Sequence, residues 1–421
     1  MTEKTYATID EEGRIILPQS MIDEWGISQG GRVSVESDEF GLRLHPPVTS
    51  LRRVYIEITN QCNLNCSTCM RNVWDVEYGR MTRETFEQIL SGFQSCSPKP
   101  NIFIGGYGEP LSHPECLTMI KQAKSLGVRV SLITNGILLT EDVARSLIGT
   151  GLDMLWVSLD GASPECYTDV RLGNALPVIL ENLNRLRSLQ YQYYGFFPWT
   201  MLPKLGIAFV AMRRNIHDLP EVVRLGTKLG AVEYSISNVL AYNSSLGEES
   251  LYLRSMNYIY GPYANHWRPL VRFPIIDIDR CTENVIIELL RNSNRLELMG
   301  NELRGNGDQC PFVERGSLSI RWDGKVSPCL PLLYTHTYFL DKRERTSREY
   351  FVGDIHKNDL YDIWNNPDYQ TLRLHLQDFD FSPCTSCNSC EMADGNLEDC
   401  YGNTHPTCGG CLWAQGFIRC P

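Results

Sequence analysis

Apolar residues along positions 52–240 follow two alternating patterns. Short apolar runs bounded by turn residues predict six strands, at Val54 to Thr59, Asn101 to Gly105, Val128 to Ile133, Met154 to Leu159, Leu205 to Met212 and Glu233 to Val239. The stretches between them repeat apolar residues with a helical period, as in Phe86, Ile89, Leu90 and Phe93 and again in Leu176, Ile179, Leu183 and Leu186. Strand–helix units in series predict an α/β fold with parallel strands, most simply a partial (βα)6 TIM-like barrel.

The segments on either side of this region have different patterns. Residues 1–48 contain the strand-like RIILP, the short helical QSMIDEWG and two alternating runs around an acidic turn, RVSVESDEFGLRL, which together predict a small β-rich module. Residues 241–305 are less regular and predict a linker or insert with substrate contacts. Residues 306–421 are rich in cysteine. We therefore predict four parts: 1–48, 52–240, 241–305 and 306–421.

The unusual sequences of the middle part fall directly after its predicted strands. CNLNCSTC follows the first strand and GGYGEP, Gly105 to Pro110, follows the second. TNG, Thr134 to Gly136, follows the third strand, and SLDG, Ser158 to Gly161, ends the fourth. Because the carboxyl ends of parallel strands meet at one mouth, these loops are predicted to form one site.

The first of these loops carries Cys62, Cys66 and Cys69 in a CxxxCxxC arrangement. Three thiolates within eight residues can hold three irons of a [4Fe-4S] cube and leave the fourth iron open to a ligand that is not part of the protein. A structural zinc site is an alternative, although zinc prefers CxxC pairs and a fourth protein ligand. A chance cluster of cysteines is the other alternative.

Composition narrows the class of protein. The chain has 421 residues, of which 43% are apolar and 21% charged, as in ordinary folded proteins. It shows neither a stretch of about 18 apolar residues nor a secretory signal pattern, so we expect a cytoplasmic protein without membrane contact. In that compartment its 16 cysteines favour metal ligation over disulfides. A net charge of -11 disfavours a nucleic-acid partner.

Nine further cysteines lie in the last part of the chain: Cys310, Cys329, Cys384, Cys387, Cys390, Cys400, Cys408, Cys411 and Cys420. The first two flank Gly324 as C-x13-G-x4-C. Two fully ligated cubane clusters would use eight cysteines, so at least one is spare. Paired CxxC steps also suit a zinc ribbon, which stays an alternative. Four isolated cysteines, Cys96, Cys116, Cys166 and Cys281, are interpreted as small buried apolar residues.

With these motifs in place, residues Arg52 to Asn238 resemble the radical S-adenosylmethionine (SAM) enzymes. The resemblance implies that Cys62, Cys66 and Cys69 ligate a [4Fe-4S] cluster whose open iron binds SAM. It further implies that an electron from a donor such as ferredoxin or flavodoxin cleaves SAM to a 5'-deoxyadenosyl radical, which abstracts hydrogen from a substrate. Thr68 departs from the aromatic residue that the family usually has there, and this affects the expected adenine contact alone.

The same resemblance assigns the residues that contact SAM. The GGE-type motif corresponds to Gly108, Glu109 and Pro110, whose backbone would meet the SAM amino group. The polar residues that contact the SAM ribose in the family correspond to Ser158 and Asp160, and Asn135 lies in the equivalent loop after the third strand. Arg171 is a further candidate, for the SAM carboxylate, because a guanidinium offers a planar fork to a carboxylate.

The cysteines of the last part, with VGDIHKNDLYDIWNNPDY ahead of CTSCNSC, resemble the SPASM extension of radical SAM enzymes that modify peptides and proteins. This resemblance implies one or two auxiliary [4Fe-4S] clusters. The usual CxxCxxxxxCxxxC is replaced by Cys384, Cys387, Cys390 and a later CGGC, so the grouping of ligands stays open.

Residues 1–48 resemble the swapped-hairpin fold of AbrB/MazE transcription factors, in IDEEGRIILPQSMIDEWGISQGGRVSV. The resemblance implies a homodimer or a docking module. DNA binding is disfavoured, because this segment has nine acidic and four basic residues and phosphate contacts need a basic face.

Together with this start, the tail DCYGNTHPTCGGCLWAQGFIRCP makes the whole chain similar to radical SAM maturases associated with tungsten-cofactor oxidoreductases of the aldehyde ferredoxin oxidoreductase type. The implied partner is a tungsten oxidoreductase or its pterin cofactor. One alternative is a maturase of ribosomally made peptides. Another is an AbrB-type regulator that senses redox state through iron-sulfur clusters.

Overall fold

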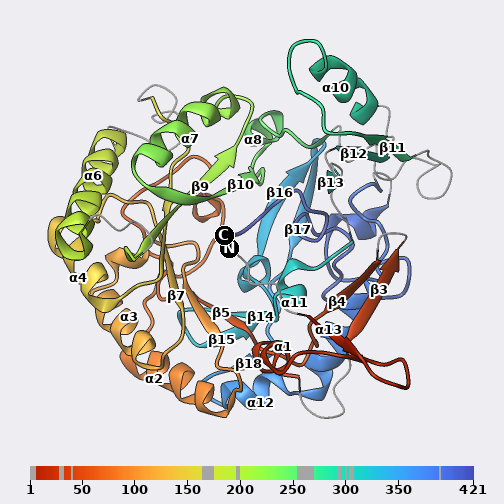
Figure 1. Cartoon of the computed structure of the whole chain (residues 1–421), viewed down its shortest axis with the longest axis horizontal. Helices are drawn as coiled ribbons and strands as arrows, with labels where there is room; N and C mark the ends of the chain where they lie inside the picture. Colours follow the sequence, from red (N-terminus) through yellow and green to blue (C-terminus); the bar gives the residue numbers. More distant parts are fainter. Residues whose placement is uncertain are drawn as a thin grey trace.

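The structure is a computed structural model that describes residues 6–27, 33–38, 41–163, 175–195, 200–253, 270–291, 295–298, 301–302, 308–387 and 390–421. Figure 1 shows an arc of helices around the outside of a curved sheet, with the C-terminal end near the centre of the view. Along the described residues, no helix combines the length and apolar character needed to cross a membrane.

Six parallel, neighbouring strands make up the sheet from one edge inward: β10 (Ala231–Asn238), β9 (Lys204–Ala211), β8 (Met154–Ser158), β7 (Val130–Thr134), β6 (Asn101–Ile104) and β5 (Arg53–Ile56). The helices that cover its outer face are α2 (Arg83–Gly92), α3 (Cys116–Ser125), α4 (Glu141–Thr150), α6 (Ala175–Tyr194) and α7 (Leu219–Lys228). The six predicted strands and the predicted α/β class are confirmed.

The helices form where local chemistry favours them. Thr82 and Thr140 cap α2 and α4, because each side chain accepts a hydrogen bond from an N–H of the first turn. Gly151 ends α4 in the left-handed conformation. The predicted apolar stripes face the sheet, and Phe86 and Ile179 are fully buried.

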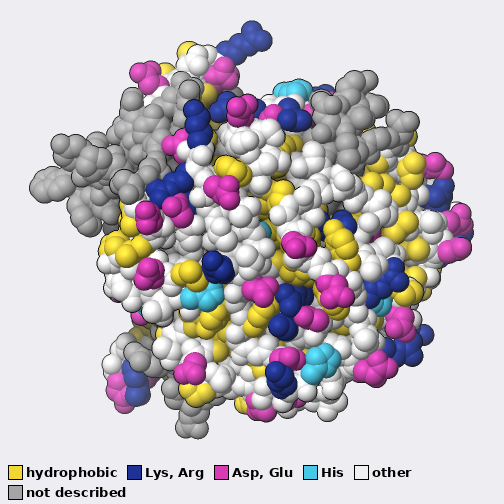
Figure 2. Space-filling view, turned by 180° about the vertical axis from the view of Figure 1, so that it is seen from behind, with side chains coloured by type: hydrophobic (Ala, Val, Ile, Leu, Met, Phe, Trp, Pro, Cys, Tyr) yellow, Lys and Arg dark blue, Asp and Glu magenta, His cyan; other side chains and the backbone are white. Residues whose placement is uncertain are grey.

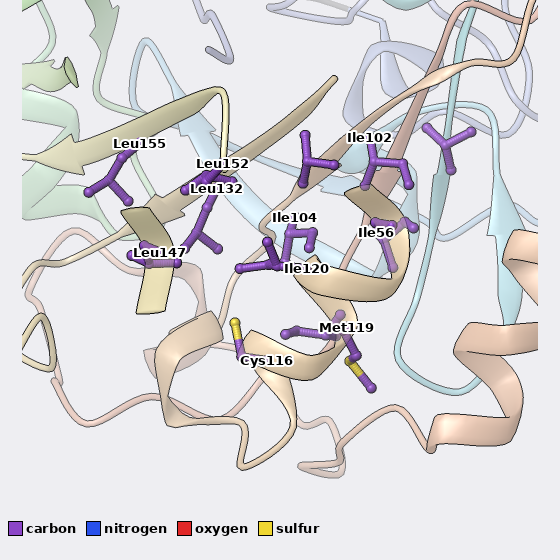
Figure 3. Close-up of a cluster of buried hydrophobic side chains, with 14 of the residues drawn as sticks. Ile56, Ile102, Ile104, Cys116, Met119, Ile120, Leu132, Leu147, Leu152 and Leu155 are labelled. Atoms are coloured by element: carbon purple, nitrogen blue, oxygen red, sulfur yellow. The ribbon is translucent and has the colours of Figure 1, made fainter. Parts of the chain in front are cut away.

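Figure 3 shows this outer core layer. Strand residues such as Ile56, Ile104 and Leu132 meet Met119 and Ile120 of α3, as well as other buried side chains from neighbouring elements. Packing strands against helices in this way removes the apolar stripes of both from water, which is the main stabilising contribution to such a fold.

The inner face of the sheet is aromatic. Tyr55, Phe103 and Trp156 form one buried cluster there. Gly206 on the neighbouring strand leaves room for the indole, because a Cβ at that position would lie 2.6 Å from a ring carbon of Trp156. The inner face is therefore a packed layer and not an open pore.

The last part of the chain continues the same sheet. β14 (Ser317–Ile320) pairs in parallel with β5, and β15 (Lys325–Ser327) and β18 (Gly353–Asp354) extend the edge antiparallel. The predicted boundary near residue 306 is therefore not a break in the sheet. Sequence reasoning missed these three strands because β14, to which the other two are joined, pairs with a strand more than 200 residues away along the chain.

The remaining C-terminal elements are short. They are α11 (Pro311–Glu314), η5 (Leu330–Leu333), the antiparallel hairpin of β16 (His336–Leu340) and β17 (Arg343–Ser347), α12 (Leu360–Trp364), α13 (Pro367–Asp378) and η6 (Glu391–Asp394). The tail then returns to the centre of the ring (Figure 1). Asn238 Nδ2 donates to Phe417 O at 2.8 Å, and Tyr55 OH donates to Pro421 O at 3.3 Å. The tail thus links β5 to β10 across the open side of the partial barrel.

The N-terminal part has the predicted strand, helix and hairpin, and a further strand at Thr8–Ile9 that was not predicted. β1 (Thr8–Ile9) pairs with β2 (Ile15–Ile16), α1 (Gln19–Trp25) follows, and β3 (Ser34–Asp38) and β4 (Gly41–His45) form an antiparallel hairpin. The insert contains α8 (Ser244–Glu248), β11 (Leu270–Phe273), α10 (Glu283–Arg291), β12 (Arg295–Leu298) and β13 (Asn301–Glu302). On the face in Figure 2, basic side chains are interspersed with acidic ones and form no basic stripe.

The isolated cysteines only partly follow the prediction. Cys116 is buried and Cys96 is half-buried, whereas Cys281 is exposed, so its assignment to the interior was wrong. Cys281 lies in the turn before α10, where its N–H donates to Asp279 Oδ1 at 2.8 Å. Cys281 lies in an apolar stretch of the sequence but is not in the core, because this turn faces outwards. Cys166 lies outside the described residues.

Candidate active site

The cysteine loop follows β5 and is held by its own backbone. Cys69 N donates to Cys66 O at 3.1 Å, and Leu64 N donates to Cys62 Sγ at 3.4 Å. Asn72, at the end of η1 (Met70–Asn72), donates through Nδ2 to Cys66 O at 2.6 Å. The loop therefore presents its three thiols from one compact turn. Cys66 is buried, and Cys62 and Cys69 are half-buried.

Two of these thiols are in surroundings that disfavour a bare negative charge. Burial raises the pKa of Cys62 and the pKa of Cys69 above their usual values. Iron is bound by thiolates, so a bound cluster would supply the positive charge that stabilises the deprotonated sulfurs. The donor set thus fits a cluster better than three free thiols.

Glu109 connects this loop to the next two strand ends. Its N–H donates to Gln61 O at 2.8 Å. Its carboxylate accepts from Thr134 Oγ1 and from Asn135 N, both at 2.7 Å. With only 2% of its surface exposed, Glu109 is a buried bracket between the loops after β5, β6 and β7. Sequence reasoning assigned a role to its backbone and missed this role of the side chain.

Asn135 reaches the cysteine loop from the end of β7. Its Nδ2 lies 2.8 Å from Asn63 Oδ1 and 3.8 Å from Cys62 Sγ. An amide donor beside a ligand sulfur is one of the contacts that tune an iron-sulfur cluster. The structure therefore brings together two motifs that are more than 70 residues apart in the sequence.

Gly108 fits closely against the stem of the cysteine loop. A Cβ at this position would lie 2.2 Å from Thr59 O and 2.6 Å from Gln61 O. Only glycine allows the two backbones to approach this closely. Pro110 follows, buried, in η3 (Pro110–Ser112). The backbone of the GGYGEP loop thus lies beside the loop that carries the three thiols. We call this stretch of backbone the Gly108 cradle; a ligand bound to the cluster would need backbone groups at such a position.

Five C-terminal cysteines gather near the inner face of the sheet. Burial, and then the nearby thiols of Cys310, Cys411 and Cys408, raise the pKa of Cys329 well above its usual value. A small cavity of about 50 Å³ is lined by Cys329, Cys408 and Cys411. Cys420 lies beside this group, where Trp413 Nε1 donates to its Sγ at 3.3 Å. We call these five residues the inner cysteine group.

The other four cysteines form a second group, which we call the outer cysteine group: Cys384, Cys387, Cys390 and Cys400. Ser382 Oγ joins two of its members, at 3.6 Å from Cys384 Sγ and 3.1 Å from Cys400 Sγ. In the part of the chain that the structure describes, no three His, Cys, Asp or Glu side chains are grouped for a single metal ion.

Family models match both regions. The model described as the radical SAM superfamily matches residues 56–204, and the model described as an iron-sulfur cluster-binding domain, SPASM, matches residues 310–391. The chain is a radical SAM/SPASM enzyme. All four strand-end motifs that form the candidate site lie within the radical SAM match. The match to the SPASM model begins at Cys310.

Relatives of this radical SAM/SPASM enzyme span most of the chain. The tungsten-containing aldehyde ferredoxin oxidoreductase cofactor-modifying protein of Pyrococcus furiosus is 28% identical over 375 residues, covering 88% of this chain and 97% of the relative. A probable GTP 3',8-cyclase of Methanocaldococcus jannaschii is 27% identical over 287 residues, covering 66% and 85%. The solved structure of Streptococcus suis SuiB bound to S-adenosylmethionine has a TM-score of 0.52 at 15% identity, covering 81% and 71%, and shows the fold alone.

The predicted contacts on β8 differ in accessibility. Ser158 is half-buried at the strand end, but Asp160 is fully buried. Asp160 Oδ1 accepts from Val210 N at 2.8 Å, and Asn215 Nδ2 donates to Asp160 O at 3.0 Å. These contacts favour a role for Asp160 in joining β8 to β9. A ribose contact through Ser158 stays a prediction, and Arg171 lies outside the described residues.

Sequence reasoning missed a buried carboxyl at the mouth of the radical SAM domain. Glu57 directly follows β5, and its Oε1 accepts from Tyr107 N at 2.9 Å. Tyr334 of the SPASM region donates its OH to Glu57 Oε2. Burial raises the pKa of Glu57 to about 7, although both hydrogen bonds act in the opposite direction. Nothing in the local sequence marks this residue, because its partners lie 50 and 277 residues away.

Replacing Glu57 by glutamine is expected to change how stability depends on pH. Between pH 4.5 and about 7 the unfolded carboxyl ionises while the folded one keeps its proton, so the wild type loses stability as pH rises. Glutamine cannot ionise, so the variant does not have this loss. Across this pH window the free energy of unfolding of Glu57→Gln should therefore rise by about 3 kcal/mol relative to that of the wild type. Thermal unfolding of both reconstituted proteins from pH 5 to 8 measures it. Parallel pH profiles would contradict the assignment.

Proposed function

We propose that this radical SAM/SPASM enzyme takes part in maturing a tungsten–pterin oxidoreductase, by modifying its cofactor or the protein that holds it. The observation that supports this substrate is the end-to-end similarity to the Pyrococcus furiosus cofactor-modifying protein, which covers 97% of that relative. Similarity over 375 residues, which is 88% of this chain, is more specific than a match to a shared core.

The proposed site holds a [4Fe-4S] cluster on Cys62, Cys66 and Cys69. With SAM bound, such a cluster supplies one-electron cleavage of SAM to a 5'-deoxyadenosyl radical. The chain's own residues provide position and shelter. Glu109 fixes the relative places of three loops, and Gly108 lets the GGYGEP loop pack directly against the backbone at the stem of the cysteine loop. The packed inner face, with Trp156, and the tail across the open side exclude water from the site.

The two cysteine groups are proposed to hold the auxiliary clusters. Four mutually close thiols, Cys310, Cys329, Cys408 and Cys411, would ligate the inner cluster. The outer group, with Cys384 to Cys400, would ligate the other. Cys420 is then the spare cysteine, held by the Trp413 indole instead of by iron. This grouping uses eight of the nine cysteines, as two cubanes require.

Anaerobic reconstitution tests the cofactors. About four irons per chain would leave only the SAM cluster, and about twelve would support two more. Under dithionite the protein should release 5'-deoxyadenosine from SAM. A redox-sensing regulator would leave SAM intact and bind an operator with steep salt dependence.

A second experiment tests the substrate. The protein is incubated with SAM, dithionite and a tungsten oxidoreductase encoded beside its gene, and the mass of the released pterin cofactor and of the polypeptide are compared with those from a reaction without SAM. A SAM-dependent mass change in either supports the proposal. A change found only in a short precursor peptide, supplied in a parallel reaction, would support the peptide-maturase alternative instead.

The N-terminal part is proposed to be an AbrB-like module through which two chains associate. A two-stranded sheet is marginally stable alone. Here β1 and β2 expose apolar side chains, with Ile9 74%, Ile15 48% and Ile16 50% exposed. Exposed apolar residues gathered on one small sheet are typical of a contact surface. The order of hairpin, helix and hairpin supports the same assignment.

Substituting Ile9 and Ile15, which lie opposite each other on β1 and β2, by glutamate should convert the dimer into a monomer. Two charges on the apolar face of β1 and β2 would have to be buried unpaired in a dimer, which costs several kcal/mol. Light scattering after size-exclusion chromatography measures the mass. The matched control is Val178→Glu, an equally apolar residue, 43% exposed on α6, which should leave the mass unchanged. A wild-type monomer at micromolar concentration would contradict the proposal.

A further inference from the structure

Arg345 is a buried cation between the two cysteine groups. It lies on β17, and only 1% of its surface is exposed. Among the described residues no ion pair with a carboxylate involves it, and its Nε has no hydrogen-bond partner. A buried charge without a counter-charge is costly, so its presence calls for an explanation.

The contacts of Arg345 lead to the outer cysteine group. Its Nη1 donates to Cys384 O at 2.8 Å, and its Nη2 reaches Cys387 O at 3.5 Å. Backbone carbonyls solvate part of the charge but carry no negative charge of their own. The guanidinium therefore lies directly behind the polypeptide that carries two of the outer thiols.

The CGGC segment of the inner cysteine group also lies beside this guanidinium. Gly410 lies between Cys408 and Cys411, and a Cβ there would be in ordinary van der Waals contact with both sides, 3.9 Å from Arg345 Nη1 and 3.6 Å from Cys384 Cβ. Tyr338 OH donates to Gly410 O at 3.4 Å. Burial raises the pKa of Tyr338 to about 12, so this phenol is neutral and supplies no counter-charge.

Two other arginines show how the chain treats such charges elsewhere. Arg343 also donates to an outer-group carbonyl, Cys390 O at 2.7 Å, but it is paired with Asp394 and more exposed. Arg373 is fully buried, but its guanidinium stacks on Trp364, 3.8 Å from the ring centroid. Among the described contacts, Arg345 has neither a carboxylate partner like that of Arg343 nor an aromatic ring like that of Arg373. The cysteine groups, as thiolates bound to iron, are left to supply its counter-charge.

We propose that Arg345 sets the charge balance of the two auxiliary clusters and raises their reduction potentials. The inference rests on the proposed function, which assigns a cluster to each group. A cubane with four thiolates is anionic, and reduction adds one electron taken from a low-potential one-electron donor. A fixed cation between both clusters stabilises the added charge on either one, and so favours electron entry and exchange through this region. Arg345 is a positioning residue and need not touch substrate.

The test uses full-length protein in which Cys62, Cys66 and Cys69 are replaced by alanine, so that only auxiliary clusters are observed. Midpoint potentials are measured by EPR-monitored redox titration for Arg345, Arg345→Gln and Arg345→Lys, alongside iron content. Arg345→Gln should lower the midpoint potential of at least one auxiliary cluster. The ratio of reduced to oxidised cluster, measured at a fixed solution potential, should fall about tenfold. For a one-electron couple this corresponds to a midpoint shift of about 59 mV. Arg345→Lys keeps the charge and should shift less. The matched control is Arg343→Gln, which removes a charge that is already paired.

The outcomes separate this inference from the proposed function. Unchanged potentials in Arg345→Gln with full iron overturn it, as does an equal shift in Arg345→Lys and Arg345→Gln. A further outcome is that Arg345→Gln fails to keep its iron. In that case, full iron and near-native potentials in Arg345→Lys support the need for a positive charge at this position. Loss of iron in both variants overturns the inference. Absence of auxiliary iron in the otherwise unaltered protein instead contradicts the proposed cluster assignment itself.

Discussion

Replacing Cys62, Cys66 and Cys69 together by alanine is expected to abolish release of 5'-deoxyadenosine from SAM. Without these thiols no iron is held beside the Gly108 cradle, and no other described cysteine lies in the loops at the carboxyl ends of β5 to β8. Iron should fall from about twelve to about eight per chain, because the auxiliary ligands are untouched. The measurements are chromatography of the nucleoside product and iron analysis after anaerobic reconstitution.

The matched control for this variant is Cys281→Ala. Cys281 is exposed in the turn before α10, and its backbone N–H, not its thiol, donates to Asp279. Its loss should change neither iron content nor product formation. Persistence of 5'-deoxyadenosine in the triple variant would show that the ligands are assigned wrongly. Iron falling to near zero would show that the auxiliary groups depend on the first cluster.

Gly108→Ala should lower the rate of SAM cleavage by about 100-fold or more while leaving the fold intact. The added Cβ would lie 2.2 Å from Thr59 O, so one of the two backbones must move by about 1 Å. Such a shift separates the GGYGEP loop from the three thiols and misplaces any ligand held between them. Steady-state formation of 5'-deoxyadenosine, with circular dichroism and iron content, distinguishes misplacement from unfolding.

Gly149→Ala is the control for the same chemical change. Gly149 is an exposed position in α4, and a Cβ there would meet nothing within 4 Å. Alanine in a helix is more favourable than glycine by roughly 0.5–1 kcal/mol, so this variant should be equally active and slightly more stable. Full activity in Gly108→Ala would mean that the cradle does not hold the cofactor.

Much of the architecture could be predicted because it depends on local spacing. Each of the six strands was found within a few residues of its observed bounds, since apolar runs and helical stripes are short-range patterns. The convergence of the strand-end loops followed from the geometry of parallel strands. The observed contacts of Glu109 and Asn135 with the cysteine loop agree with that expectation.

Other features depend on which distant segments pack together. Spacing alone could not say that β14 would pair with β5, or that Tyr334 would donate to Glu57 across 277 positions. The outward turn at Cys281 shows the same limit, because an apolar stretch is buried only if something covers it.

The sequence by itself determined the cysteine loop, the order of strands and helices and the class of chemistry, because all of these follow from residues close together in the chain. Tertiary structure decided the division of the C-terminal cysteines into inner and outer groups, the burial of Arg345 between them and the closure of the partial barrel by the tail. These arise where segments far apart in sequence compete for the same apolar surface, and only the packed chain shows which of them meet.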